Sequence, residues 1–202
     1  MRSAPLPMQP AFIRLEGAIR RLYPQCTAAE WAYLRSGFQA EALPAQALFG
    51  QVRQEHRLSF VAQGLMRIYY VNSQGQEVTI RFAAEGDYST DYYAFITQTP
   101  SLFHLQSLEP TTLLTASYQH IQHCYQLHPG LERYGRLIAE EVFRDQHQRL
   151  VSFQMDPAEQ RYLHFLHQHP ALFQRISLTH LASYLGIERQ SLSRIRKKLV
   201  GP

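Results

Sequence analysis

Near the carboxyl end of the chain, three side chains have the hydrogen-bonding groups that read nucleic acid bases. Arginine can bind the edge of guanine through two parallel hydrogen bonds, and glutamine can bind adenine in the same way. Arg189, Gln190 and Arg194 bring these groups into one short segment. Hydroxyl and ammonium groups nearby are suited to phosphate oxygens. The candidates for phosphate contacts are Ser177, Thr179, Ser191, Ser193, Lys197 and Lys198.

The positive charge of the chain is concentrated in the same segment. Residues 175–202 contain six basic residues and one acidic residue, a net charge of +5 in 28 residues. The other 174 residues have 14 basic and 15 acidic side chains, so the whole chain carries +4. A basic terminus on a nearly neutral body favours a polyanionic partner. On charge alone, a solvated helix face near the terminus is an equally good interpretation.

Two short helices joined by a tight turn would place these side chains on one surface. Ser177 is typical of a residue that caps a helix start, and the small Ala182 permits a second helix to cross closely. Gly186 allows the positive φ of a tight turn, and Ile187 would fill the angle between the helices. The spacing predicts a helix-turn-helix, against the alternative of an ordinary helical hairpin. The buried face of the second helix would carry Leu192, Ile195 and Leu199.

The middle of the chain has the pattern of many short strands. Residues 65–71 and 77–82 have the composition of two strands, and the turn residues between them would form a hairpin. Alternation returns at residues 103–108, and residues 111–118 are rich in β-forming side chains. Short strands punctuated by turns predict a sandwich or barrel with a filled interior.

A helical period follows the strands. Apolar residues from Leu127 onward recur at spacings of four, three, four and four, which is typical of a coiled-coil seam. Such a seam needs an apolar partner, either the body of the protein or the same helix of a second chain. Flanking charges favour an exposed helix that pairs in a dimer. The residues predicted to pair are Leu131, Tyr134, Ile138 and Val142.

Capping residues predict the starts of two further helices. Thr27 and Glu30 have the spacing of a capping box, in which each side chain accepts from the other's backbone amide. Asp156 is expected to cap the next helix, with Pro157 at its first position. Residues 1–22 are expected to form an N-terminal extension with a short amphipathic stretch.

The composition excludes several classes of protein. With 45% hydrophobic and 18% charged residues, the chain is neither disordered nor fibrous. It has no apolar run near the ~18 residues of a membrane span, and its first residues do not form a secretory signal. Cys26 and Cys124 are too few for a disulfide framework. The expected location is therefore the reducing cytoplasm, without membrane contact.

The order of these elements resembles the Crp/Fnr family of bacterial transcription regulators. Residues 64–70, 75–79 and 82–87 look like the hairpin and loop of the family's cyclic-nucleotide-binding β-roll. Residues 176–199 match its helix-turn-helix without a gap, and the resemblance covers about residues 25–199. It implies a homodimer that binds a palindromic operator.

The resemblance also implies an α+β fold. An N-terminal double-stranded β-helix, or jelly roll, of the cyclic-nucleotide-binding type would precede a long dimerisation helix and a C-terminal helix-turn-helix. The family's base-reading positions fall on Arg189, Gln190 and Arg194. The expected boundaries are residues 1–22 for the extension, 23–128 for the sensor domain, 129–154 for the dimerisation helix and 155–202 for the DNA-binding domain.

The chain departs from the family at the ligand. Nucleotide binders of the family have a Gly-Glu pair after the Gly-Asp turn and an Arg-Ser pair further along. This chain has Thr90-Asp91 and Ser101-Leu102 instead, and residues 82–132 contain no Arg or Lys. Because a buried phosphate without a cation is costly, cyclic AMP is not expected as the effector.

Aromatic side chains surround this loop. An apolar or aromatic effector could bind there, or the side chains could simply fill the space. The residues predicted to contact an effector are Thr90, Asp91, Tyr92, Ser101 and Leu102.

The histidines point to another class of function. His120, His123, Cys124 and His128 have helical spacing and could bind a metal ion, although a surface helix with a partly buried cysteine is the favoured interpretation. The rival hypothesis is a cupin-type β-barrel metalloprotein or enzyme with a helical tail. Because the predicted strands have no histidine cluster, no metal, cofactor or catalytic residue is predicted.

The residues thus favour a DNA-binding transcription regulator over an enzyme. Double-stranded DNA and a second copy of the chain are the predicted partners. RNA polymerase and a small-molecule effector of unknown identity are further candidates.

Overall fold

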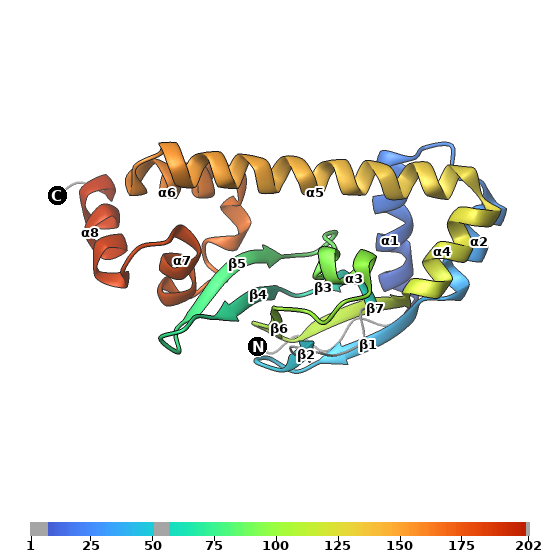
Figure 1. Cartoon of the computed structure of the whole chain (residues 1–202), viewed down its shortest axis with the longest axis horizontal. Helices are drawn as coiled ribbons and strands as arrows, with labels where there is room; N and C mark the ends of the chain where they lie inside the picture. The colour runs from blue at the N-terminus through green and yellow to red at the C-terminus, as the bar shows by residue number, and fades with distance from the viewer. Residues whose placement is uncertain (1–7, 51–56, 201–202) are drawn as a thin grey trace. The chain divides into compact units, whose positions relative to one another are not determined.

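The described part of the chain comprises residues 8–50 and 57–200 of a computed structural model (Figure 1). Residues 1–7 of the expected N-terminal extension lie outside the described residues, as do residues 201–202 of the expected DNA-binding domain.

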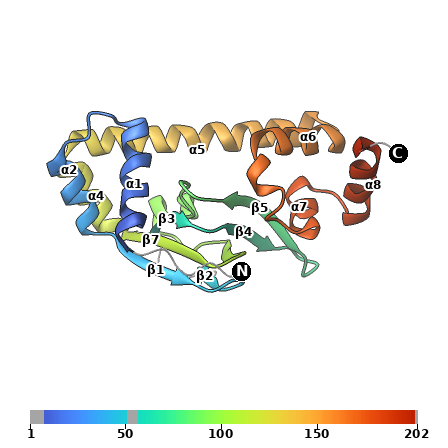
Figure 2. The same cartoon turned by 180° about the vertical axis from the view of Figure 1, so that it is seen from behind.

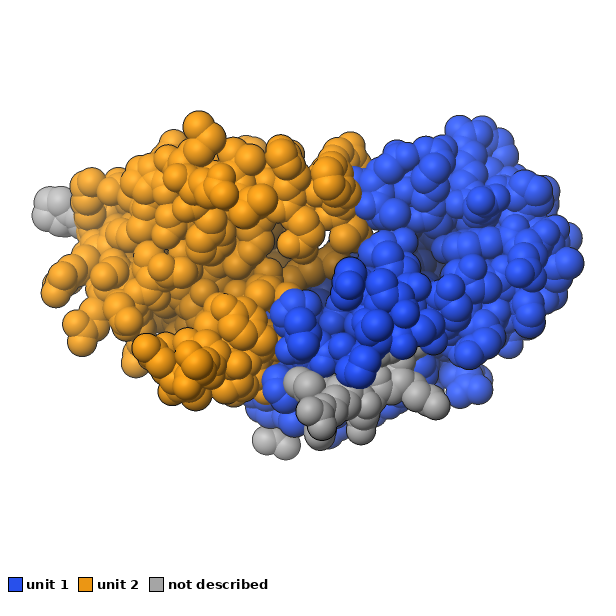
Figure 3. All heavy atoms as spheres, viewed as in Figure 1, with its two compact units in different colours: residues 1–68, 82–141 blue, residues 69–81, 142–202 orange. Residues whose placement is uncertain are grey.

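The chain is divided into two compact units (Figure 3). Unit 1 contains residues 1–68 and 82–141, and unit 2 contains residues 69–81 and 142–202. The chain passes between the units within three elements, which are β4 (Met66–Val71), β5 (Glu77–Ala83) and α5 (Pro129–Met155).

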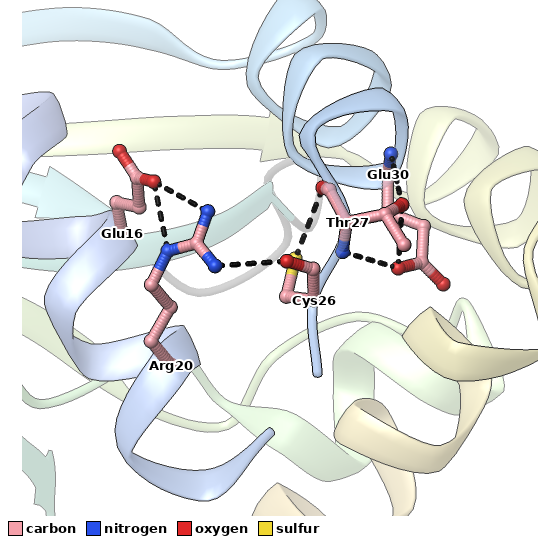
Figure 4. Close-up of polar contacts among 5 residues, drawn as sticks. All are labelled: Glu16, Arg20, Cys26, Thr27 and Glu30. Carbon is pink, nitrogen blue, oxygen red and sulfur yellow. Dashed lines mark hydrogen bonds and ion pairs between the residues drawn. The ribbon is translucent and has the colours of Figure 1, made fainter. Parts of the chain in front are cut away.

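Unit 1 begins with two helices, α1 (Met8–Leu22) and α2 (Ala28–Ser36). The predicted capping box starts α2, because the Glu30 amide donates to Thr27 Oγ1 over 3.2 Å and the Thr27 amide donates to Glu30 Oε2 over 2.8 Å (Figure 4). Arg20 of α1 pairs with Glu16 and donates to the Cys26 carbonyl over 2.8 Å. The apolar side of α1 is buried through Ala11, Phe12, Leu15 and Ile19.

Two sheets follow the helices. The first has the strand order β1 (Gln39–Leu43), β7 (Thr111–Ser117), β3 (Arg57–Gln63). The second has the order β2 (Leu48–Gly50), β6 (His104–Ser107), β4, β5. The predicted hairpin is therefore β4–β5, and the α+β fold with its β-roll is confirmed.

One buried apolar cluster of unit 1 lies on one face of the first sheet. Phe60 and Ala62 of β3 alternate with residues of the other face, as Leu114 and Ala116 do in β7. Helices α1, α2, α4 (Tyr118–Leu127) and the start of α5 add side chains to the same cluster. Burying each large apolar side chain contributes about 1.5–3 kcal/mol.

Unit 2 contains the C-terminal helices (Figure 2). They are α6 (Ala158–Gln168), the short η1 (Pro170–Leu172), α7 (Leu178–Leu185) and α8 (Arg189–Val200). The prediction that Asp156 caps α6 is wrong, because the cap position is Pro157. The Asp156 carboxylate instead accepts from the Ser152 hydroxyl over 2.6 Å.

Gly64 occupies a turn that only glycine tolerates. Its φ is +99°, and a Cβ there would lie 2.7 Å from the Thr111 Cα. Its amide donates to Glu85 Oε1 over 2.8 Å. The chain therefore approaches β7 through a backbone contact that leaves no room for a side chain.

We predict that Gly64→Ala lowers the free energy of unfolding by more than about 2 kcal/mol, because it adds a steric clash to the strain of a positive φ. Gly75 is the matched control, since its φ is +77° and its Cβ would meet nothing within 4 Å. Gly75→Ala is expected to lose only about 1 kcal/mol. Urea unfolding of both variants measures the difference, and equal losses would contradict the clash.

Candidate DNA-reading surface and effector loop

The turn between α7 and α8 has the predicted geometry. The Ser177 hydroxyl caps α7 by accepting from the His180 amide over 3.1 Å, so part of its bonding capacity is used inside the helix. Gly186 ends α7 in the left-handed conformation with φ +65°. A Cβ on Gly186 would lie 2.6 Å from the ring of Phe153. These local constraints fix where α8 begins.

One side of α8 is exposed and basic. Leu192 is fully buried, whereas Arg189, Gln190, Arg194 and Lys197 are exposed. At 100° per residue, Gln190, Arg194 and Lys197 lie about 140–160° around the helix from Leu192, whereas Arg189, in the first turn, lies about 60° from it. All four residues are accessible to solvent, and we call Arg189, Gln190, Arg194 and Lys197 the α8 face.

Some of the other residues predicted to contact DNA have partners within the protein. The Ser193 hydroxyl donates to the Arg189 carbonyl over 3.1 Å, and Ser191 is half-buried beside the α8 face. Lys198 pairs with Glu159 over 2.7 Å. Thr179 is exposed in the first turn of α7.

The predicted effector loop is tied together by its own hydrogen bonds. Asp91 caps α3 (Tyr92–Thr97), accepting from the Ala94 amide over 3.2 Å. Its second carboxylate oxygen accepts from the Ser101 hydroxyl over 2.7 Å, and both residues are buried. Thr90 is also buried and accepts from the Ser59 amide over 2.9 Å. The polar groups expected to meet a ligand therefore have partners within unit 1.

The remaining loop residues have different environments. Tyr92 is half-buried on α3, and burial raises the pKa of its phenol. Leu102 is 72% exposed, although its neighbour Ser101 is buried. Thr90, Asp91 and Ser101 thus form the buried part of the loop, and Leu102 does not belong to it.

A pair of tyrosines joins this loop to α5 within unit 1. The hydroxyls of Tyr88 and Tyr134 are 3.0 Å apart, and the Tyr88 ring packs edge-on against Phe60. Burial, together with the neighbouring Tyr134, holds the pKa of Tyr88 well above its usual value. Burial likewise raises the pKa of Tyr134. No local pattern predicts this contact, because the two residues are 46 positions apart.

The face of α5 that was predicted to pair is partly buried within unit 1. Leu131 is 1% exposed and Tyr134 is 6% exposed, and both belong to the core of unit 1. Ile138 is half-buried against the same core, and Val142 is also half-buried. The predicted seam is therefore occupied at its start by the protein's own core, the alternative that the apolar pattern had left open.

A second stripe on α5 carries exposed apolar side chains. Phe143 is 70% exposed and Leu150 is 56% exposed. They recur with Ala139 and Gln146 at spacings of four, three and four, the period of a coiled-coil seam. We call Ala139, Phe143, Gln146 and Leu150 the α5 stripe. It lies about 100° around the helix from the predicted seam.

The histidine-rich part of α4 has structural partners. Cys124 Sγ lies 3.4 Å from His120 Nε2, and burial raises the pKa of the thiol to about 11. The His120 ring stacks on Tyr33, and its Nε2 is 3.0 Å from the Leu34 carbonyl oxygen. Within residues 8–50 and 57–200, no group of three or more His, Cys, Asp or Glu side chains is arranged to hold a metal ion.

Comparison with known proteins agrees with this architecture. Residues 41–128 match the cyclic nucleotide-binding domain family. The β-rich part of the chain is therefore similar to cyclic nucleotide-binding domains. Among curated proteins, none is similar enough in sequence to be matched to this chain. Within the described residues, no helix has the length and apolarity required to cross a bilayer.

Solved structures of bacterial regulators share the fold of the chain. CLP of Xanthomonas campestris is 18% identical, with a TM-score of 0.68, over 86% of this chain and 91% of that one. FixK2 of Bradyrhizobium japonicum is 13% identical, with a TM-score of 0.70, over 80% and 84%. A Crp/Fnr family regulator of Eubacterium rectale is 14% identical, with a TM-score of 0.64, over 86% and 83%. The predicted likeness to Crp/Fnr regulators is thus confirmed at the level of the fold.

We predict that Tyr88 and Tyr134 are energetically coupled. Tyr88→Phe or Tyr134→Phe alone leaves one buried hydroxyl without its partner, which costs about 1–3 kcal/mol. The double variant should lose less than the sum of the single losses, as measured by urea unfolding in a double-mutant cycle. Strict additivity would show that the two hydroxyls do not stabilise each other.

The same pair predicts a pH dependence. Both phenols have a pKa that is raised in the folded state above the unfolded value near 10, so the folded state holds their protons more tightly. Their contribution is complete below pH ~10 and is lost as the pH rises toward the folded-state values. Above pH ~10, the free energy of unfolding should fall less steeply in the double Phe variant than in the parent.

Proposed function

We propose that the protein is a transcription regulator that binds a two-fold symmetric DNA site as a homodimer. The observation that carries the proposal is the α8 face, which is basic and exposed on the second helix of a helix-turn-helix. The cyclic nucleotide-binding domain and the shared fold of bacterial regulators support the same function.

The chemistry of the α8 face suits a major groove. Arg189 and Arg194 offer paired donors to guanine, and Gln190 offers a donor and an acceptor to adenine. Each such bidentate pair discriminates against a wrong base by about 1–3 kcal/mol. Lys197, on the same side of α8, suits a phosphate. A half-site read by this helix should therefore contain guanine and adenine.

Pairing through the α5 stripe would produce the required symmetry. Two recognition helices read successive major grooves about 34 Å apart, so their separation must be fixed. A second copy of α5 would cover Phe143 and Leu150, which are otherwise exposed to water. We therefore move the proposed pairing from the predicted seam to the α5 stripe.

The effector loop favours a regulator that does not use a cyclic nucleotide. Asp91 is an acceptor already bonded to Ser101 and Ala94, and an anionic ligand would meet its negative charge. CLP is described as responsive to cyclic di-GMP, but residues 82–132 of this chain contain no Arg or Lys to neutralise a phosphate. An apolar or aromatic effector, or none, is consistent with the aromatic surroundings.

The first test is selection of bound fragments from the source organism's genomic DNA, at physiological salt and without added ligand. We expect recovery of a shared palindrome, because the α8 face is exposed in the chain as it stands. The Arg189→Ala, Arg194→Ala double variant should lose this enrichment. If the double variant recovers the same palindrome, α8 is not the reader.

Two further variants separate base reading from phosphate binding. Gln190→Glu should shift one position in each half-site from adenine to cytosine, because a carboxylate accepts from the cytosine amino group. Lys197→Ala should weaken binding to all sequences and reduce the salt slope by about one. An unchanged base preference in Gln190→Glu would remove Gln190 from the base-reading residues.

We predict that Phe143→Glu prevents dimerisation, because two carboxylates would meet in an apolar seam. Sedimentation velocity should then report a dimer for the parent and a monomer for the variant. Leu127→Glu is the matched control, since Leu127 is an exposed apolar residue on α4, away from the α5 stripe. A Phe143→Glu variant that remains dimeric would exclude the α5 stripe as the pairing face.

A further inference from the structure

The outer edge of the β4–β5 hairpin is paired by a side chain of the helix-turn-helix. Strand β5 is last in its sheet, and an edge strand leaves backbone donors and acceptors without a neighbouring strand. The Ser183 hydroxyl accepts from the Thr79 amide over 2.9 Å and donates to the Glu77 carbonyl over 2.9 Å. One hydroxyl thus bonds two backbone groups that an adjacent strand would otherwise pair.

An arginine of α5 completes the same contact. Arg149 donates to the Tyr184 carbonyl over 3.0 Å and to the Thr79 carbonyl over 3.4 Å. Its guanidinium lies 3.9 Å from the centre of the Tyr184 ring and 4.7 Å from that of Phe153. Such cation–π contacts strengthen when water is excluded, and burial of Arg149 lowers its pKa.

Three elements of unit 2 therefore meet at one place. The hairpin provides Glu77 and Thr79, α5 provides Arg149, and α7 provides Ser183 and Tyr184. We call this set the hairpin joint. Figures 1 and 2 both show α7 beside the hairpin, in agreement with these bonds. All five residues belong to the unit that contains the DNA-reading helix.

The hairpin joint holds α7 without covering the α8 face. Ser183 lies one turn before Gly186, where the chain turns into α8. Arg189, Gln190, Arg194 and Lys197 remain exposed while the joint is formed. The conformation with the joint closed is therefore compatible with DNA binding.

We propose that Ser183 is a positioning residue for DNA binding, which fixes the helix-turn-helix against the β4–β5 hairpin. This inference rests on the proposed function. A reader that is not held in one orientation binds with an affinity reduced by the fraction of molecules in the competent orientation. Because a dimer must orient two readers at once, losing both hydroxyls should weaken operator binding by about tenfold.

The test measures the affinity of the full-length protein for a labelled duplex recovered by the genomic selection. Ser183→Ala removes the hydroxyl, and Ser183→Thr retains one and should restore binding to within about twofold of the parent. Ser73→Ala is the matched control, because Ser73 is an exposed serine of the same hairpin outside the joint. Arg149→Lys is a second variant that keeps the charge but loses the planar stacking group, and it should also weaken binding.

Hydrogen exchange of the Thr79 amide provides the readout that separates positioning from simple stability. In Ser183→Ala, this amide should exchange faster while the protein stays folded at the temperature of the binding assay. Faster exchange with unchanged DNA affinity would make the hairpin joint structural only and overturn the proposal. Unchanged exchange and unchanged affinity would overturn it as well.

Failure of the proposed function and failure of the positioning role give different results. If the parent protein recovers no DNA in the selection and binds none at low salt, the proposed function fails, and with it the role of Ser183. If the parent binds its palindrome and neither Ser183→Ala nor Arg149→Lys weakens binding, only the positioning role is overturned.

Discussion

Helix α5 buries one face in unit 1 and leaves a different face exposed, and the proposed dimer depends on this division. Its first turns place Leu131 and Tyr134 in the core of unit 1, where they are no longer available for pairing. Phe143 and Leu150 face another direction and remain exposed. Because α5 continues from unit 1 into unit 2, one continuous helix connects the β-rich domain to the segment that ends in α8.

The polar groups of the predicted effector loop form hydrogen bonds within the domain itself. A hydrogen bond to a charged group is worth about 1.5–3 kcal/mol, and Asp91 makes such bonds with Ser101 and with the amide of Ala94. A ligand that used the Asp91 carboxylate would first have to replace them. The Tyr88–Tyr134 pair already connects the loop to α5, so this connection exists within the protein itself.

Local signals in the sequence were sufficient for the capping box at Thr27, the β4–β5 hairpin and the turn at Gly186, because neighbouring residues determine caps and turns. The partner of an apolar face was not predictable in this way. The seam containing Leu131 satisfied the helical period, but the period does not say whether the core or a second chain covers it. The contact of Ser183 with Thr79 joins residues 104 positions apart and has no local pattern at all.

Two cations of the C-terminal segment have contacts within the protein. Arg196 lies 4.9 Å from the centre of the Phe173 ring, and Lys198 pairs with Glu159. An exposed ion pair is worth at most about 1 kcal/mol, so Lys198 could exchange Glu159 for a phosphate at little cost. Arg196 would lose its ring contact by doing so. The cations of the α8 face are then Arg189, Arg194 and Lys197, two of which suit bases. Recognition of DNA would therefore depend more on base contacts, and less on phosphate contacts, than the net charge of +5 in residues 175–202 suggests.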